Sequence, residues 1–374
     1  MPSDGCPGPR PYTRGMAAFD LSTSTVDLTR QFCDVESVSG DEATIVDRIE
    51  ETLARAPHLE VVRDGDAIVA RTHLGRAQRV VVAGHIDTVP LAVEANLPCR
   101  YETDGGVEYL WGRGTVDMKA GSAVHLALAV ELAEPVVDVT WVWYDHEEVS
   151  DSLNGLGRLA RTRPELLAAD LAILGEPTNG RVEGGCNGNL RVEVRTFGRR
   201  SHSARSWVGD NAIHRAAPIL ELLAAYEARE VEVEGLVYRE GLNAVGITGG
   251  VAGNVVPDEC MVHVNYRFAP SRSPEEAVAH VTELFAGFDV RVVDLAPGAR
   301  PGLDAPLARQ FVAAVGGEPG PKYGWTDVAR FSALGVPAVN YGPGDPMLAH
   351  HDHERVAVEQ VLENERGLRA WLSA

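Results

Sequence analysis

Residues 79–90 read RVVVAGHIDTVP, an apolar, β-branched run that ends in a histidine and an aspartate. Its first part, Arg79–Ala83, predicts a buried strand. Three further runs predict buried strands that are also followed closely by His, Asp or Glu: Val137–Tyr144, Leu171–Leu174 and Pro337–Tyr341. Because ligands bind beyond the carboxyl ends of the strands in open α/β sheets, these four strand ends predict a polar site. Their alternation with longer amphipathic runs predicts an α/β fold with a mixed, largely parallel sheet.

The middle of the chain changes character and predicts an inserted α+β unit of the split βαβ kind. Two amphipathic helices are expected there, at Asn211–Ala228 and Ser273–Gly287. Four runs in the same region predict strands: Leu190–Phe197, Asn243–Gly249, Glu259–Phe268 and Val290–Leu295. The predicted domains are a disordered tail (1–18), a catalytic domain in two parts (19–189 and 298–374) and, between them, a lid or dimerisation domain (190–297).

Length and composition limit the classes of function. The 374 residues suggest two domains. A formal net charge of −20 disfavours a nucleic-acid partner, which would need clustered Lys and Arg. No apolar run approaches the roughly 20 residues that a membrane helix needs, and the tail lacks the apolar core of a signal peptide. The five cysteines are scattered, without a Cys-x-x-Cys pair, which favours a reducing compartment. We therefore expect a cytoplasmic protein without a membrane or nucleic-acid partner.

The first polar clusters contain His85, Asp87 and Asp117. A histidine that leaves a strand, with an aspartate two positions later, suits a metal-binding imidazole that a carboxylate orients. A lone histidine at a strand end is, however, more often an ordinary core or surface residue. Asp117 follows a glycine-rich segment and precedes the predicted helix Met118–Ala133. It suits either a carboxylate that bridges two cations or a simple N-cap, worth about 1 kcal/mol.

The remaining clusters add acids and histidines. Glu147 and Glu148 follow a predicted strand, so that one could bind a metal while the other faces a water molecule. Glu176 follows another strand, and residues 349–354 read AHHDHE, which holds three of the twelve histidines. Exposed acids and loop histidines are common, so each cluster alone is weak. Together they supply imidazole and carboxylate ligands without thiolates, which suits zinc at a catalytic site.

In this order, the motifs resemble those of a clan of two-zinc peptidases and deacylases that includes aminoacylases, acetylornithine deacetylases and succinyl-diaminopimelate desuccinylases. The resemblance runs from about Asp20 to the C-terminus. It implies two Zn²⁺ ions, with Co²⁺ possible at one or both positions. The ligands that it implies are His85 and Glu176 for one ion, Glu148 and His350 for the other, and Asp117 as the bridge.

The same resemblance implies roles for other residues of the catalytic part. Glu147 would be the general acid/base, and Asp87 would orient His85. The peptide bond between Asp117 and Met118 would be cis.

The resemblance also covers the insert and the desuccinylase branch of the clan. The segment GRRSHSA (198–204) resembles one whose histidine, here His202, crosses a dimer interface to stabilise an oxyanion, which implies a homodimer. Asn254 and Arg267 lie in segments that resemble substrate-contacting parts of the lid, and the fork of an arginine suits a carboxylate. Thr326, in GWTDVARF (324–331), would also contact substrate. An exposed loop histidine and a solvated arginine are the competing interpretations.

The expected reaction is removal of the succinyl group from N-succinyl-LL-2,6-diaminopimelate by zinc-activated water, in lysine and diaminopimelate biosynthesis. One alternative is another small-molecule N-acyl amino acid deacylase of the acetylornithine type, or a dipeptidase of the same clan. A different class is a non-catalytic binding protein that keeps the fold, although Glu147 beside a full ligand set argues against it.

Two departures from the family pattern affect these expectations. His353 stands where the final motif usually has Asn or Asp, so that His351 and His353 compete with His350 as the metal ligand. The segment Gly185–Asn189 lacks an arginine that desuccinylases commonly have there. The second departure puts the acyl group in doubt more than the reaction.

Overall fold

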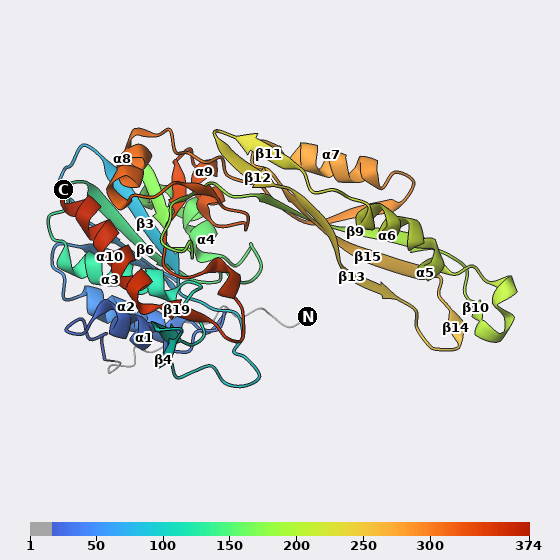
Figure 1. The fold of residues 1–374 in the computed structure, drawn as a ribbon, viewed down its shortest axis with the longest axis horizontal. Coiled ribbons are helices and arrows are strands. Elements are labelled where there is room, and N and C mark those ends of the chain that lie inside the picture. Colours follow the sequence, from blue (N-terminus) through green and yellow to red (C-terminus); the bar gives the residue numbers. More distant parts are fainter. Residues whose placement is uncertain (1–16) are drawn as a thin grey trace, which may run out of the picture. The chain divides into compact units, whose positions relative to one another are not determined.

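A computed structural model describes residues 17–374 of the chain. The described residues form two compact units, one made of residues 17–167 and 342–374 and the other of residues 168–341. Figure 1 labels the elements of each unit. The predicted disordered tail lies outside the described residues except for positions 17 and 18.

The first unit contains a four-stranded part of a mixed sheet in the order β1-β2-β6-β3. Strand β3 runs parallel to β6, whereas β2 is antiparallel to β6 and β1 is antiparallel to β2. The four strands are β1 (Glu60–Asp64), β2 (Ala67–Arg71), β3 (Arg79–His85) and β6 (Asp138–Tyr144). A separate sheet has the order β19-β5-β4, with β4 (Arg100–Asp104), β5 (Val107–Trp111) and β19 (Arg355–Ala357).

The helices of the first unit cover its sheet. They are α1 (Thr25–Cys33), α2 (Ala43–Leu53), α3 (Lys119–Glu131), α4 (Gly155–Thr162) and α10 (Val358–Ser373). Helix α3 packs against β3, and α1 and α10 pack against α3. The close approach depends on Gly84, because a Cβ there would lie 2.4 Å from Ser122 Oγ and 2.9 Å from Met118 Cε. This packing fixes the end of β3 against the start of α3.

The second unit contains four short strands in the order β7-β18-β8-β17. Strands β7 and β18 are parallel, β8 and β17 are parallel, and β18 is antiparallel to β8. Their bounds are β7 (Leu171–Leu174), β8 (Glu183–Gly184), β17 (Gly320–Pro321) and β18 (Ala338–Asn340). Helix α9 (Val328–Ala333) packs on β7 and β18, and α8 (Pro306–Val315) precedes it in the chain. The predicted α/β class with a mixed sheet is confirmed.

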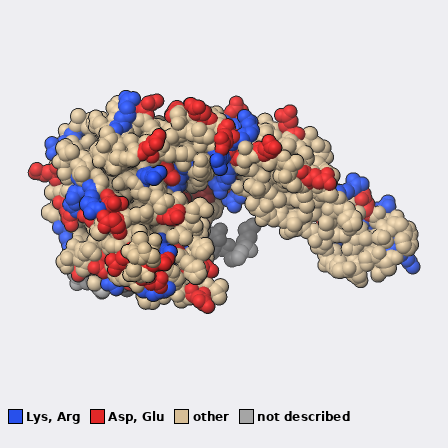
Figure 2. All heavy atoms as spheres, in the orientation of Figure 1, with Lys and Arg blue, Asp and Glu red and all other residues tan. Residues whose placement is uncertain are grey.

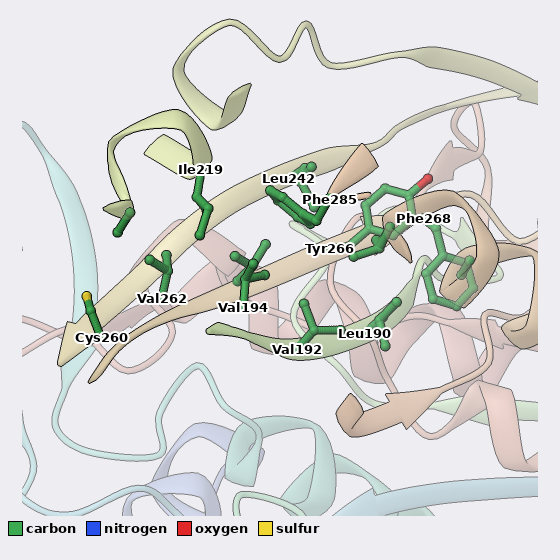
Figure 3. Packing of buried hydrophobic residues seen from close by; sticks show 14 of the residues in the cluster. Leu190, Val192, Val194, Ile219, Leu242, Cys260, Val262, Tyr266, Phe268 and Phe285 are labelled. Carbon is green, nitrogen blue, oxygen red and sulfur yellow. The ribbon is translucent and has the colours of Figure 1, made fainter. Parts of the chain in front are cut away.

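The second unit also contains a four-stranded antiparallel sheet, which we call the lid sheet, in the order β13-β15-β9-β16. Its strands are β9 (Gly188–Phe197), β13 (Gly241–Gly249), β15 (Glu259–Phe268) and β16 (Asp289–Ala296). Alternate residues of these strands pack under α5 (Ala212–Arg215), α6 (Ala217–Ala224) and α7 (Pro274–Leu284). Figure 3 shows this core, in which Val192, Val194 and Val262 lie on the strands and Ile219 and Phe285 come from the helical side.

One helix predicted for the insert is interrupted in the structure. The expected helix Asn211–Ala228 is two short helices that meet at Ala216. Pro218 stands in the first turn of α6, where its missing N–H costs nothing, but it cannot continue the hydrogen bonds of α5. The hairpin β11 (Glu230–Val233) and β12 (Leu236–Arg239) follows and had no counterpart among the expected strands.

The predicted domain boundaries at 189/190 and 297/298 stay a prediction. The two compact units divide at 167/168 and 341/342. Within residues 17–374, no helix combines the length and the apolar character that crossing a membrane requires. On the face shown in Figure 2, the Lys and Arg side chains lie interspersed with Asp and Glu.

Candidate metal centre

The centre begins with His85, which ends strand β3 and is fully buried. Its Nδ1 lies 3.0 Å from the carbonyl oxygen of Asp87, and its Nε2 lies 3.1 Å from Oδ1 of Asp117. Burial alone would lower the pKa of His85, but hydrogen bonds with Asp117 and Asp87 raise it well above its usual value. The ring is thus oriented through Nδ1, and Nε2 is directed at a carboxylate.

Asp87 holds the acidic loop as well as His85. Its Oδ1 accepts a hydrogen bond from the backbone N–H of Glu147 (3.0 Å), and its Oδ2 accepts from that of Glu148 (3.1 Å). Oδ2 also accepts from the hydroxyl of Ser39 at 2.6 Å. Burial would raise the pKa of Asp87, but the bonds from His85 and Ser39 and that from the Glu147 amide lower it, so the carboxylate stays ionised. One buried acid therefore connects the ends of β3 and β6.

Asp117 is placed between two histidines and does not cap a helix. Helix α3 begins at Lys119, and its N-cap residue, Met118, makes no side-chain cap bond. The N-cap interpretation of Asp117 is therefore wrong. Its Oδ1 faces His85, and its Oδ2 lies 3.3 Å from Nε2 of His350. The Asp117–Met118 peptide bond is cis, as the resemblance implies.

His350 completes the group from the other end of the chain. Its Nε2 lies 3.0 Å from the Glu148 carboxylate. Hydrogen bonds with Asp117 and then with Glu148 raise the pKa of His350 to about 10. The rings of His351 and His353 are 5.5 Å apart and contact each other. Of the three histidines in this loop, it is thus His350 that meets the acids.

The donor atoms lie close enough to share a cation. One ligand atom each from His85, Asp117 and Glu148 falls within 4.8 Å of the others. Burial and the negative charge of Asp117 raise the pKa of Glu148, because two adjacent carboxylates disfavour each other's ionised form. Imidazole and carboxylate donors without thiolates suit zinc or a similar divalent ion. The residues present therefore fit a metal centre.

Two buried acids support the centre and were not assigned a role from the sequence. Glu354 accepts hydrogen bonds from the backbone N–H groups of Val116 (2.9 Å) and Asp117 (3.1 Å), and from Arg113 at 2.8 Å. Glu42 accepts from the backbone N–H of His146 at 3.3 Å. Glu354 belongs to the histidine loop, so its place in that motif was the one available signal. Glu42 had no such signal, because it lies far from the clusters in the chain.

The other predicted site residues belong to the second unit. Glu176 is buried directly after β7. His202 is exposed in the short strand β10 (Ser201–His202), which pairs with β14 (Val255–Val256), and the carbonyl oxygen of Asn254 accepts a hydrogen bond from Ser203. Arg267 lies on β15, away from this pair. Thr326 is buried, and its hydroxyl donates to Asn340 at 2.9 Å.

Comparison with known proteins gives a consistent result. Residues 81–373 match the model of the family described as peptidase family M20/M25/M40. The chain is 48% identical over 366 residues to the succinyl-diaminopimelate desuccinylase of Corynebacterium glutamicum, covering 95% of this chain and 98% of that one. It is 52% identical over 357 residues to a Mycobacterium tuberculosis protein that is provisionally named succinyl-diaminopimelate desuccinylase DapE, covering 95% and 99%.

Solved structures share the fold at low sequence identity. A tripeptidase from Staphylococcus aureus superposes with a TM-score of 0.75 at 20% identity, covering 95% of this chain and 98% of that one. A protein from Bacillus subtilis, described as a dinuclear metal-binding peptidase, superposes with a TM-score of 0.68 at 16% identity, covering 94% and 97%.

Proposed function

This chain belongs to peptidase family M20/M25/M40, and from that premise we propose that it removes the succinyl group from N-succinyl-LL-2,6-diaminopimelate in lysine and diaminopimelate biosynthesis. The observation that carries the proposal is the convergence of two histidines and two carboxylates, remote in the chain, within the first unit. The near full-length similarity to two desuccinylases supports the choice of substrate.

The ligand set that we propose holds two divalent cations. His85 and Glu176 would hold one cation, His350 and Glu148 would hold the other, and Asp117 would be shared by both. For Glu176 the support is its sequence motif, whereas the contacts described above support the other four. Two bound Zn²⁺ ions, or Co²⁺, would polarise the amide carbonyl and lower the pKa of a water molecule.

Glu147 is the proposed general acid/base. It removes a proton from the attacking water as the oxygen bonds to the carbonyl carbon, and it gives that proton to the amine nitrogen as the C–N bond breaks. The Asp87 carboxylate fixes the backbone N–H groups of both Glu147 and Glu148. This anchoring supports the proposal, because it fixes the backbone of both residues where strand β6 ends.

The second unit would recognise the substrate. We assign Arg267, Asn254 and Thr326 to this task, with Arg267 as the partner of a substrate carboxylate. His202 would stabilise the developing oxyanion in the site of a second copy of the chain. Its exposure at the end of the lid sheet, on a strand pair outside the core, supports that assignment.

A homodimer follows from that role of His202, and the lid sheet offers a surface for it. Strand β13 is an edge of this sheet, and its Val245 and Ile247 side chains are 64% and 50% exposed. Leu220 on the adjacent α6 is 41% exposed. In Figure 2 the end of this unit that holds α5, β10 and β14 shows mostly uncharged side chains. An apolar edge strand beside an apolar helix suits pairing with a second copy.

Cytoplasmic location is part of the proposal. The thiols of Cys33, Cys99, Cys186 and Cys260 are all free and buried. Free thiols suit a reducing compartment.

The decisive experiment for the substrate is an assay of the zinc-loaded protein. Succinyl-diaminopimelate, acetylornithine and simple dipeptides would be compared by kcat/KM. Preference for succinyl-diaminopimelate is expected. Preference for acetylornithine would indicate an acetylornithine-type deacylase instead, and preference for a dipeptide would indicate a dipeptidase of the same clan.

The test of the chemistry is Glu147→Gln. We expect kcat to fall by about a hundredfold or more, because the proton carrier is lost, while two metal ions per chain are retained. Metal content and steady-state turnover would be measured together. Glu134→Gln, at an exposed position after α3, is the matched control and should keep both. Full turnover in Glu147→Gln would remove the proposed base.

A further inference from the structure

A line of hydrogen bonds crosses three strands of the lid sheet and ends at Arg267. Asp294 on β16 accepts at Oδ2 from Nδ2 of Asn189 (3.1 Å) and from Nε and Nη2 of Arg191 (3.0 and 2.9 Å). Asn189 Oδ1 accepts from Nδ2 of Asn265 at 2.7 Å, and Asn265 Oδ1 accepts from Nε of Arg267 at 3.2 Å. All of these residues belong to the second unit.

The two ends together set the direction of the whole line, because the Asp294 carboxylate accepts and the Arg267 guanidinium only donates. An ionised carboxylate only accepts, so Asn189 must turn its NH₂ group toward Asp294 and its oxygen toward Asn265. Asn265 must then turn its own NH₂ group toward Asn189, which leaves its oxygen for Arg267. With a neutral amide in place of Asp294, an NH₂ group could face Asn189, and the direction would be held from the Arg267 end alone.

A β-bulge puts Asp294 in this position. Val292 pairs with Val192, but the next pair is Asp294 with Arg191, so Val293 is the extra residue. If the ladder continued without a bulge, Val293 would pair with Arg191 and Asp294 with Leu190, whose side chain lies in the hydrophobic core on the helical side. A shift of one residue moves a side chain to the other face of a sheet, and bulges re-aim side chains in this way.

The guanidinium of Arg267 is held but not neutralised. Its Nε is fixed by Asn265, and within residues 17–374 no carboxylate forms an ion pair with it. Burial, together with the positive charge of Arg191, lowers the pKa of Arg267. Its cross-strand neighbour on β13 is Gly241, where an added Cβ would meet only Asn243 Nδ2, at 3.8 Å. Space is therefore left beside a half-buried, unpaired cation.

We propose that Asp294, acting through Asn189 and Asn265, positions Arg267 to receive a carboxylate group of the substrate. Because Nε is already engaged, the two terminal nitrogens remain for the ligand, and their fork suits both oxygens of one carboxylate. Asp294 is a positioning residue that does not touch the substrate. This inference rests on the proposed function and adds the reason why the lid arginine is specific for an anion.

The test compares two aspartates of the same strand. Asp294→Asn removes the acceptor-only end of the line, and Asp289→Asn removes a carboxylate that pairs with Arg195 and Arg291 instead. In the zinc-loaded protein, Asp294→Asn should raise KM for succinyl-diaminopimelate about tenfold, with kcat within about twofold. Asp289→Asn should leave both constants unchanged. Asn265→Leu, which interrupts the line at its centre, should reproduce the effect if Asp294→Asn lowers the yield of folded protein.

A double variant separates positioning from a general loss of structure. If Asp294 acts through Arg267, the double variant Asp294→Asn with Arg267→Met should have a KM no more than about twofold above that of Arg267→Met alone. The penalty of Asp294→Asn should also vanish for one of two analogues, in which either the succinyl or the α-carboxylate is a carboxamide. Additive losses, a penalty that persists with both analogues, or an unchanged KM in Asp294→Asn would overturn the inference.

Failure of the proposed function is a different result. It would appear as absence of succinyl-diaminopimelate turnover by the unaltered chain. The same variants would then be measured on acetylornithine and a dipeptide, each of which also carries a carboxylate, with the same criteria.

Discussion

A single carboxylate, that of Asp87, contacts three parts of the candidate metal centre. It lies 3.4 Å from Nδ1 of His85 and accepts the backbone N–H groups of Glu147 and Glu148. Both oxygens are used, so an amide in this place would put an NH₂ group against at least one N–H donor. The positions of the His85 ring and of the Glu147 and Glu148 backbone are therefore fixed by contacts with one residue.

His125 is a second buried group whose charge state matters. It lies on α3 beside Trp141, and within the described chain neither ring nitrogen has a hydrogen-bond partner. Burial lowers the pKa of His125 to about 3. In the unfolded chain its pKa is about 6.5, so the unfolded state binds the proton more readily. Its contribution to stability is thus present above pH 6.5 and is lost as the pH falls toward 3.

We predict that His125→Leu makes folding less sensitive to acid. The buried histidine makes the free energy of unfolding about 2 kcal/mol smaller at pH 5 than at pH 8, and the variant should lack this difference. Urea unfolding of zinc-saturated protein at both pH values measures the difference. His214→Leu, at an exposed position of α5, should keep the pH dependence of the unaltered chain. An equally steep dependence in His125→Leu would show that the proton is bound elsewhere.

Between elements, Glu354 connects the histidine loop to the segment that leads into α3. Its carboxylate accepts hydrogen bonds from the backbone N–H groups of Val116 and Asp117. It also forms an ion pair with Arg113, in which both side chains are less than 5% exposed. The segments that carry Asp117 and His350 are thereby fixed to each other. Two of the proposed metal ligands, more than 200 residues apart in the chain, are thus held by this one acid.

Glu354→Gln should therefore destabilise the chain and weaken metal binding. It leaves the Arg113 guanidinium buried without its counter-charge, which costs about 3 kcal/mol. The free energy of unfolding, from urea titration, and the affinity for zinc, from calorimetry, would be measured. Glu359→Gln, on the exposed side of α10, removes only a surface ion pair with Arg366 and should change stability by less than about 0.5 kcal/mol. Unchanged zinc affinity in Glu354→Gln would contradict this account.

At the scale of the whole molecule, the two edges of the lid sheet distinguish a dimer from a monomer. Strands β13 and β16 are the two edges, and both carry exposed apolar side chains. We predict that Ile247→Asp on β13 yields a monomer, because it places a charge in the proposed interface. Val293→Asp on β16, at a position 59% exposed, should stay dimeric. Sedimentation velocity would measure both, and a dimeric Ile247→Asp protein would refute the proposed edge.

Activity should follow the dimer if His202 acts in the neighbouring site. Ile247→Asp and His202→Ala should both lose turnover, the latter with little change in substrate affinity. Mixing His202→Ala with Glu147→Gln chains should restore about a quarter of the activity, since half of the dimers are mixed and each has one complete site. No restoration after exchange of subunits would place His202 in its own site.

The sequence by itself determined the class of the fold and the residues of the candidate centre. Strands β3, β6 and β7 were predicted close to their observed bounds, because a buried strand is a local run of apolar residues. Their polar ends were visible for the same reason.

Only the tertiary structure decided which of these residues meet. It selected His350 over its two neighbours, turned Asp117 from a possible cap into a link between imidazoles, and used Pro218 to divide a helix. It also paired Glu354 with Arg113 and, through one extra residue in β16, brought Asp294 to Arg191. A hydrogen bond has two partners, and when they are far apart in the chain no local pattern contains both.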